Sequence, residues 1–274
     1  EYLIIALIIL LAFISRFALV GLRVMSHDEV NHVVPSYNLY SGSGYAHDPV
    51  THGPLQFHLV ALSYFLLGDS DFSSRVPAAL FSTAAIIFIL FGFRRYLGRI
   101  GSLFGGFLFL ISPFILFYGR YTRNEAFIEL FAVMTFYAFF RYYEKRDDRS
   151  LYLLAAVTAL QFVTKEVAYI YTAQFLLFCG LLFLVDLRDV DWKPKEGENF
   201  LPSLFKQLRR FPSFNLIIFL GALILPQLAA FPIKWIGWDP LDYSETGILR
   251  SGGVLLFFFA LSFLIGIWWN RRVF

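Results

Sequence analysis

Long apolar runs constrain this chain more than any other feature of its sequence. A transmembrane helix needs about 20 apolar residues, because the hydrocarbon core of a bilayer is about 30 Å thick. The 274 residues are 58% hydrophobic, more than a soluble domain of this size can bury. We therefore predict about eight membrane-spanning helices, near residues 2–22, 76–93, 100–118, 125–141, 151–164, 167–186, 214–232 and 250–269.

A ninth apolar run, residues 55–67, is too short to span a bilayer. Pro54 and Gly68 bound it, and it contains His58, so we expect a helix that lies in the membrane interface. The predicted fold class is an all-α integral membrane protein with interfacial helices in its first outer loop.

The distribution of Lys and Arg predicts the orientation in the membrane. Fifteen of these residues fall on one side of the predicted spans and seven on the other, with Arg16 inside the first span. The positive-inside rule makes the richer side cytoplasmic. Both ends of the sequence then face the cytoplasm, and the loops at 23–75, 119–124, 165–166 and 233–249 face outward. Residues 186–213 are polar and are expected to form a cytoplasmic loop within a single transmembrane domain, 1–274.

All five histidines lie in the first outer loop, at positions 27, 32, 47, 52 and 58. One interpretation is a polar, solvated loop with no chemistry. Another is a divalent metal site, for which His47, Asp48 and His52 are the candidate ligands. No histidine falls in the middle of a span, which disfavours a haem protein. The basic residues form no single patch, which disfavours a nucleic-acid partner.

Charged residues also mark the outer ends of other spans. Arg120 and Arg123 lie among tyrosines in a short outer loop, and Lys165 lies in another. Guanidinium groups suit phosphate, because they offer paired planar donors. The alternative is that these side chains anchor at lipid headgroups. Glu125 and Glu129 are one helical turn apart, so they face the same way, and Glu129 should face a polar interior or a partner.

Four motifs, in this order, carry a resemblance to a known family. They are Ser26-His27-Asp28-Glu29 after the first span, Ser74-Arg75-Val76-Pro77 opening the second, Tyr118-Gly119-Arg120-Tyr121-Thr122-Arg123-Asn124-Glu125, and Phe162-Val163-Thr164-Lys165-Glu166. Over residues 1–185 the chain resembles the polyprenyl-phosphate-sugar-dependent glycosyltransferases of the GT-C fold. The likeness is greatest to the protein O-mannosyltransferase and aminoarabinose transferase branch, including its flippase-associated prokaryotic subgroup. Residues 214–274, the last two spans, lie beyond it.

The resemblance implies a membrane enzyme that moves a sugar from a polyprenyl-phosphate donor to an acceptor at the outer face, with inversion. It implies that Asp28 is the catalytic base and that Glu29 assists it. Arg120, Arg123 and Lys165 would bind the donor phosphate, with Glu125, His27 and His32 behind them. The implied partners are the donor, membrane lipids and further membrane subunits, and no cofactor is required.

The chain departs from the family pattern in having fewer spans, so it is either a piece of a longer protein or a shortened relative. Two other functions therefore stay open. One is a non-catalytic scaffold or accessory subunit of a larger membrane complex, which the shorter chain favours. The other is a lipid flippase or transporter, although most spans lack the breaks near the midplane that transporters show.

The orientation can be tested by labelling. A cysteine introduced at Ser43 should react with an impermeant reagent in intact cells, because the first loop faces outward. A cysteine at Gly197, in the predicted cytoplasmic loop, should be protected. The reverse pattern would contradict the predicted topology.

Overall fold

The computed structural model describes residues 1–45, 52–192, 199–240 and 242–269. All regular structure in these residues is helical, and they contain no strand. The chain divides into two compact units, Glu1–Ile170 and Tyr171–Phe274, which are described separately.

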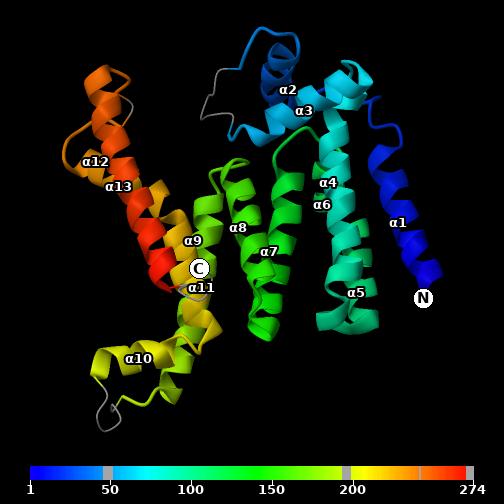
Figure 1. Ribbon diagram of the computed structural model, residues 1–274. Helices are drawn as coiled ribbons and strands as arrows, with labels where there is room; N and C mark the ends of the chain where they lie inside the picture. The colour runs from blue at the N-terminus through cyan, green and yellow to red at the C-terminus, as the bar shows by residue number, and fades with distance from the viewer. Residues whose placement is uncertain (46–51, 193–198, 241, 270–274) are drawn as a thin grey trace. The chain divides into compact units, whose positions relative to one another are not determined.

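In the first unit, long helices form a bundle and two shorter helices, α2 and α3, lie at one end of it (Figure 1). Contacts join α4 to α1, α5 and α7, and join α7 to α8. The helices are α1 (Tyr2–Phe17), α2 (His27–Tyr40), α3 (Leu55–Leu67), α4 (Asp71–Gly92), α5 (Arg94–Ile111), α6 (Pro113–Tyr118), α7 (Glu125–Lys145) and α8 (Asp148–Phe162), and α9 (Ala168–Asp186) begins at the boundary.

An arginine lies in the core between α1 and α5. Arg16 is fully buried, next to an apolar cluster that includes Ile8, Ile86 and Leu110. Its guanidinium donates to the carbonyls of Phe109 at 2.9 Å and of Leu110 at 3.1 Å. The Phe109 carbonyl would ordinarily accept the N–H of residue 113, but proline has none. Arg16 therefore satisfies a carbonyl that Pro113 leaves without its helical partner.

Two more arginines satisfy carbonyls at the end of α1 and in the segment that follows it. Arg120 donates to the carbonyls of Ser15 and Ala18, at the end of that helix. Arg75 donates to the carbonyls of Val20 and Arg23, in the segment leading to α2. The last carbonyls of a helix have no helical partner, and a nearby cation also suits the negative end of the helix dipole.

The second unit is built around α11 and α13, which contact each other and the short helix η3. Arg209 lies over the rings of Trp268 and Trp269, with its guanidinium carbon 5.4 and 4.8 Å from their centres. The remaining elements are η2 (Leu187–Asp189), α10 (Phe200–Leu208), α11 (Pro212–Ile224), η3 (Leu225–Ala229), α12 (Ala230–Trp235) and α13 (Glu245–Trp269).

Four helical segments of the described chain are long and apolar enough to cross a membrane: Asp71–Gly92, Ala168–Asp189, Pro212–Trp235 and Glu245–Trp269. The helix α1, with 16 residues, is apolar but shorter, and so is α3, with 13. An all-helical, multi-pass membrane protein is therefore confirmed, whereas the number of eight spans stays a prediction. The short helix α3 coincides with the residues predicted to lie in the interface.

Candidate active site

The helix α2 begins at a capping box made by Ser26 and Glu29. The Ser26 hydroxyl accepts from the backbone N–H of Glu29, and a Glu29 carboxylate oxygen accepts from the backbone N–H of Ser26 at 3.1 Å. This reciprocal pair satisfies two N–H groups that a helix start otherwise leaves open. The Ser26 hydroxyl also hydrogen-bonds the Tyr121 hydroxyl. The box fixes how α2 is rotated about its axis, and so decides which acidic residue is buried.

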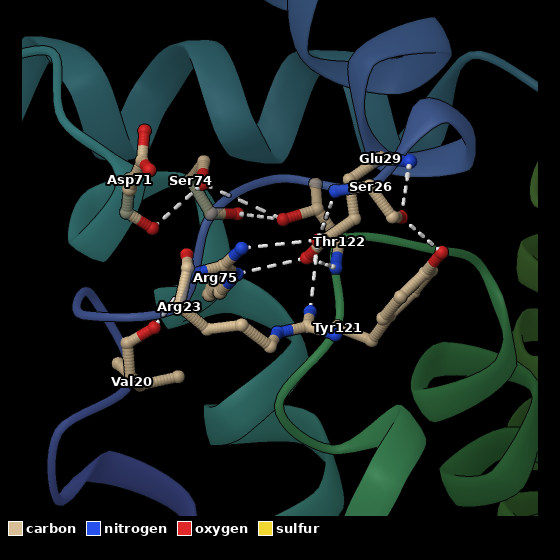
Figure 2. Close-up of polar contacts among 9 residues, drawn as sticks. All are labelled: Val20, Arg23, Ser26, Glu29, Asp71, Ser74, Arg75, Tyr121 and Thr122. Carbon is tan, nitrogen blue, oxygen red and sulfur yellow. Dashed lines mark hydrogen bonds and ion pairs between the residues drawn. The ribbon is translucent and has the colours of Figure 1, made fainter.

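Glu29 is the buried one, and Figure 2 shows it at the centre of a polar network. Arg75 donates to both of its carboxylate oxygens, at 2.8 and 3.0 Å, and Arg23 donates at 2.8 Å. The backbone N–H of Thr122 donates at 3.1 Å. Three segments far apart in the sequence therefore meet on one carboxylate: α2, α4 and the loop before α7.

The network keeps Glu29 ionised. Burial alone would raise its pKa, but the hydrogen bonds from Arg75 and from the N–H groups of Ser26 and Thr122 outweigh burial, and the pKa is lowered. With all of these donors on its two oxygens, the Glu29 carboxylate is poorly suited to accept a proton from a substrate.

Asp28 points the other way. Its side chain is 58% exposed, and Arg123 donates to it at 3.0 Å. Adjacent residues of a helix point about 100° apart, so burial of Glu29 and exposure of Asp28 have one cause. The role of a catalytic base implied for Asp28 favours a carboxylate kept away from cations, which would weaken it as a base. The structure differs here, because Arg123 contacts it directly.

Arg123 and Lys165 are joined by a shared carboxylate. The Nζ of Lys165 lies 2.8 Å from Glu125, and the Nε of Arg123 lies 3.5 Å from the other oxygen of the same side chain. These residues come from the loop before α7, from the start of α7 and from the turn between α8 and α9. Together with Asp28 they form a group of four charged side chains, which we call the charged cluster.

Arg120 is not part of the charged cluster. Its guanidinium donates to the carbonyls at the end of α1, as described above. Of the three cations expected to bind the phosphate, the structure thus brings together Arg123 and Lys165. Arg120 instead lies at the end of α1.

Of the described histidines, His32 and His52 lie near the charged cluster. His27 is exposed and contacts Asn31, and His58 contacts the Pro54 carbonyl. His52 contacts Glu166 at 2.7 Å. The ring of His32 stacks on those of His52 and Phe57, at centroid distances of 6.2 and 5.8 Å.

A close backbone contact holds the segment of His52 in place. Gly53 donates to the carbonyl of Thr164, and Leu55 donates to that of Val163. A side chain on Gly53 would lie 2.3 Å from the Val163 carbonyl oxygen, so only glycine fits here.

Within the described residues, no three His, Cys, Asp or Glu side chains are placed to hold a metal ion. Two of the predicted metal ligands, His47 and Asp48, lie outside the described residues. The metal site therefore stays a prediction.

Sequence reasoning missed Arg75 and Thr122 as partners of Glu29. One signal was available, because Ser26-His27-Asp28-Glu29 has the Ser-x-x-Glu spacing of a capping box, which assigns Glu29 to the helix start. Nothing local points to Arg75, which is 46 residues away in the sequence.

Comparison with family models now adds an independent observation. Residues 51–192, just over half of the chain, match the model of the dolichyl-phosphate-mannose-protein mannosyltransferase family. The chain belongs to this family. No curated protein and no solved structure gives a significant match.

Membership of the mannosyltransferase family confirms a membrane glycosyltransferase of the type that uses a polyprenyl-phosphate sugar. The matched range contains Arg75, Arg123, Glu125 and Lys165. It begins after Asp28 and Glu29, so their roles rest on the sequence motif and the geometry.

The pKa of His32 makes the stability of the fold depend on pH. Burial, with a smaller contribution from nearby Arg123, lowers the pKa of His32 to about 4 from 6.5. The unfolded chain therefore binds more protons than the folded one between about pH 6.5 and 4, and stability should fall across this window as the pH falls. Each pH unit costs at most about 1.4 kcal/mol.

The measurement is the Tm in detergent from pH 7.5 downwards. His32→Leu should flatten the decline between pH 6.5 and 4.5 relative to the wild type. His27→Leu, which alters an exposed histidine, is the matched control and should leave the slope unchanged. Equal slopes for the wild type and His32→Leu would contradict the prediction.

Proposed function

We propose that this chain transfers a sugar from a polyprenyl-phosphate donor to an acceptor hydroxyl at the outer face of the membrane. The observation that carries the proposal is the charged cluster itself. It combines one exposed carboxylate with two cations, contributed by three separate segments that meet at one end of the bundle. If these cations only anchored the protein at lipid headgroups, they would not be expected to converge, because each side chain would reach the lipid independently.

The chemistry assigned to the cluster is a single displacement. The acceptor hydroxyl attacks the anomeric carbon and gives its proton to Asp28. The bond from that carbon to the phosphate oxygen breaks, and its electron pair leaves with the lipid phosphate. Configuration is inverted. The leaving group needs no proton, so the main demand on the protein is to stabilise the negative charge that develops on the phosphate.

Arg123 and Lys165 are the groups proposed to stabilise that charge. In the structure their charges are balanced by Asp28 and Glu125, at 3.0 and 2.8 Å. The donor phosphate would replace Asp28 as the partner of Arg123. Donor binding would then free Asp28 to act as a base.

Glu29 has a positioning role in this proposal. Its contacts to Arg75 and Thr122 tie the start of α2 to the loop that carries Arg123. These contacts therefore fix the position of Asp28, the proposed base, relative to Arg123, the proposed phosphate ligand. In this proposal Arg120 is also structural. It donates to the carbonyls at the end of α1 and does not bind the phosphate.

Loss of the base should abolish most activity without affecting folding. Asp28→Asn keeps the shape of an exposed side chain but removes the proton acceptor, so transfer should slow by roughly 10²–10⁴-fold. Transfer from a polyprenyl-phosphate sugar would be measured beside the Tm. Asp148→Asn is the matched control, because Asp148 is also exposed and lies in the first turn of its helix. A well-folded Asp28→Asn protein with unchanged transfer would rule out the base.

A lysine cannot reproduce the contacts of Arg123. Its Nη1 and Nε face two different carboxylates, and a lysine offers only one nitrogen. Arg123→Lys should weaken binding of polyprenyl phosphate by about tenfold, as expected for loss of one charged hydrogen bond. Arg141→Lys is the control, since Arg141 also uses two nitrogens, but on Asp147. Equal phosphate affinity in the wild type and Arg123→Lys would argue against the phosphate site.

A further inference from the structure

The turn that carries Lys165 is bonded through its backbone to the segment that leads into α3. Gly53 donates to the carbonyl of Thr164 at 3.1 Å, and Leu55 donates to that of Val163 at 3.0 Å. These carbonyls directly follow the end of α8, where a helix leaves its last carbonyls without a helical partner. The segment before α3 supplies that partner, and so fixes the backbone on the N-terminal side of Lys165.

His52 adds a side-chain contact on the other side of Lys165. Its Nδ1 lies 2.7 Å from a carboxylate oxygen of Glu166. Lys165 is therefore held at both of its neighbours, through the carbonyl of Thr164 and the side chain of Glu166. A lysine ammonium sits on a flexible four-carbon stem, so the place of its backbone decides which groups it can reach. Here it reaches Glu125 in the charged cluster, at 2.8 Å.

The backbone of His52 is in an unfavourable conformation. Its φ is +72°, in the left-handed region that few residues other than glycine adopt. Such conformations persist where the surrounding structure holds them, and they are common at functional sites. The next residue is Gly53, where a Cβ would lie only 2.3 Å from the Val163 carbonyl oxygen. The contact with the turn thus maintains a conformation that His52 would not favour alone.

His52 also contacts the helix that carries the proposed base. Its ring stacks on that of His32, with 6.2 Å between the ring centres. His32 lies one turn after Asp28, on the same face of α2. His52 therefore touches both α2 and the turn of Lys165, as Glu29 touches both α4 and the loop of Arg123.

Stability alone gives little reason for the contact between His52 and Glu166. The Glu166 side chain is 52% exposed, and exposed ion pairs contribute little to folding. Loss of the contact can therefore be studied in a folded protein.

We propose that His52 and Glu166 are positioning residues, whose contact holds the turn so that the Lys165 ammonium lies at the donor phosphate. This inference rests on the proposed function and adds how one of the two phosphate-binding cations is held. His52 acts through Glu166 and Lys165, and neither His52 nor Glu166 binds the donor itself.

The first experiment removes the exposed carboxylate. Glu166→Ala should weaken binding of polyprenyl phosphate to the full chain in lipid nanodiscs by about fivefold, the range expected for loss of one hydrogen bond, with an unchanged Tm. In a Lys165→Met background, Glu166→Ala should have no further effect on affinity, because the cation through which it acts is already absent. Glu144→Ala is the matched control, since Glu144 also forms an exposed ion pair, with Arg95, and should leave the affinity unchanged.

The second experiment alters the histidine. His52→Gly removes the side chain and tolerates a positive φ, so it should weaken binding about as much as Glu166→Ala. His52→Asn should restore most of the affinity, because the Asn amide nitrogen occupies nearly the place of Nδ1 and asparagine also adopts the left-handed region. The double variant of His52→Gly and Glu166→Ala should bind no more weakly than either single variant, since both remove the same contact.

Three results would overturn the inference in distinguishable ways. If His52→Gly weakens binding and Glu166→Ala does not, His52 acts on its own and not through Glu166. If Glu166→Ala weakens binding further in the Lys165→Met background, its effect does not pass through Lys165. If the wild type does not bind polyprenyl phosphate at all, the proposed function fails together with the inference.

Discussion

The ion pair between Glu29 and Arg75 is the interaction on which the rest of the bundle end that carries α2 and α3 depends (Figure 1). Both side chains are fully buried. Removing either partner would leave an uncompensated buried charge, which typically costs about 3–5 kcal/mol. The same carboxylate also binds the N–H of Thr122, and the same guanidinium binds the carbonyls of Val20 and Arg23. One pair therefore holds the segment between α1 and α2, the start of α2 and the loop that carries Arg123.

A second constraint comes from backbone groups that need partners away from water. In a membrane protein, the carbonyls at a broken or ending helix must be satisfied by the protein itself. Arg16 donates to the carbonyl that Pro113 leaves without a helical partner, and Arg120 donates to a carbonyl at the end of α1. These arginines are thus explained by the backbone. Arg123 differs from them, because it contacts the carboxylates of Asp28 and Glu125.

The helical, membrane-embedded character of the chain was predictable because it follows from local composition. The bounds of the short helix α3 were predictable for the same reason, since Pro54 and Gly68 bound a short apolar run. The site was predictable in its types of residue but not in its pairing. Arg120 and Arg123 are three residues apart in one loop, yet one faces α1 and the other faces Asp28. Only the packing of distant helices distinguishes them.

The adjacency of Asp28 and Glu29 has a physical reason in this geometry. A base that acts on a hydroxyl must keep its carboxylate accessible, so it cannot also anchor its own helix. Its neighbour can, because a residue one position further along the helix points about 100° away and reaches the interior. Glu29 takes that position through its capping bond with Ser26 and its contact with Arg75. These bonds set the rotation of α2, and that rotation presents Asp28 to Arg123 and places His32, one turn later, on the same face. The buried acid therefore fixes the position of the exposed acid.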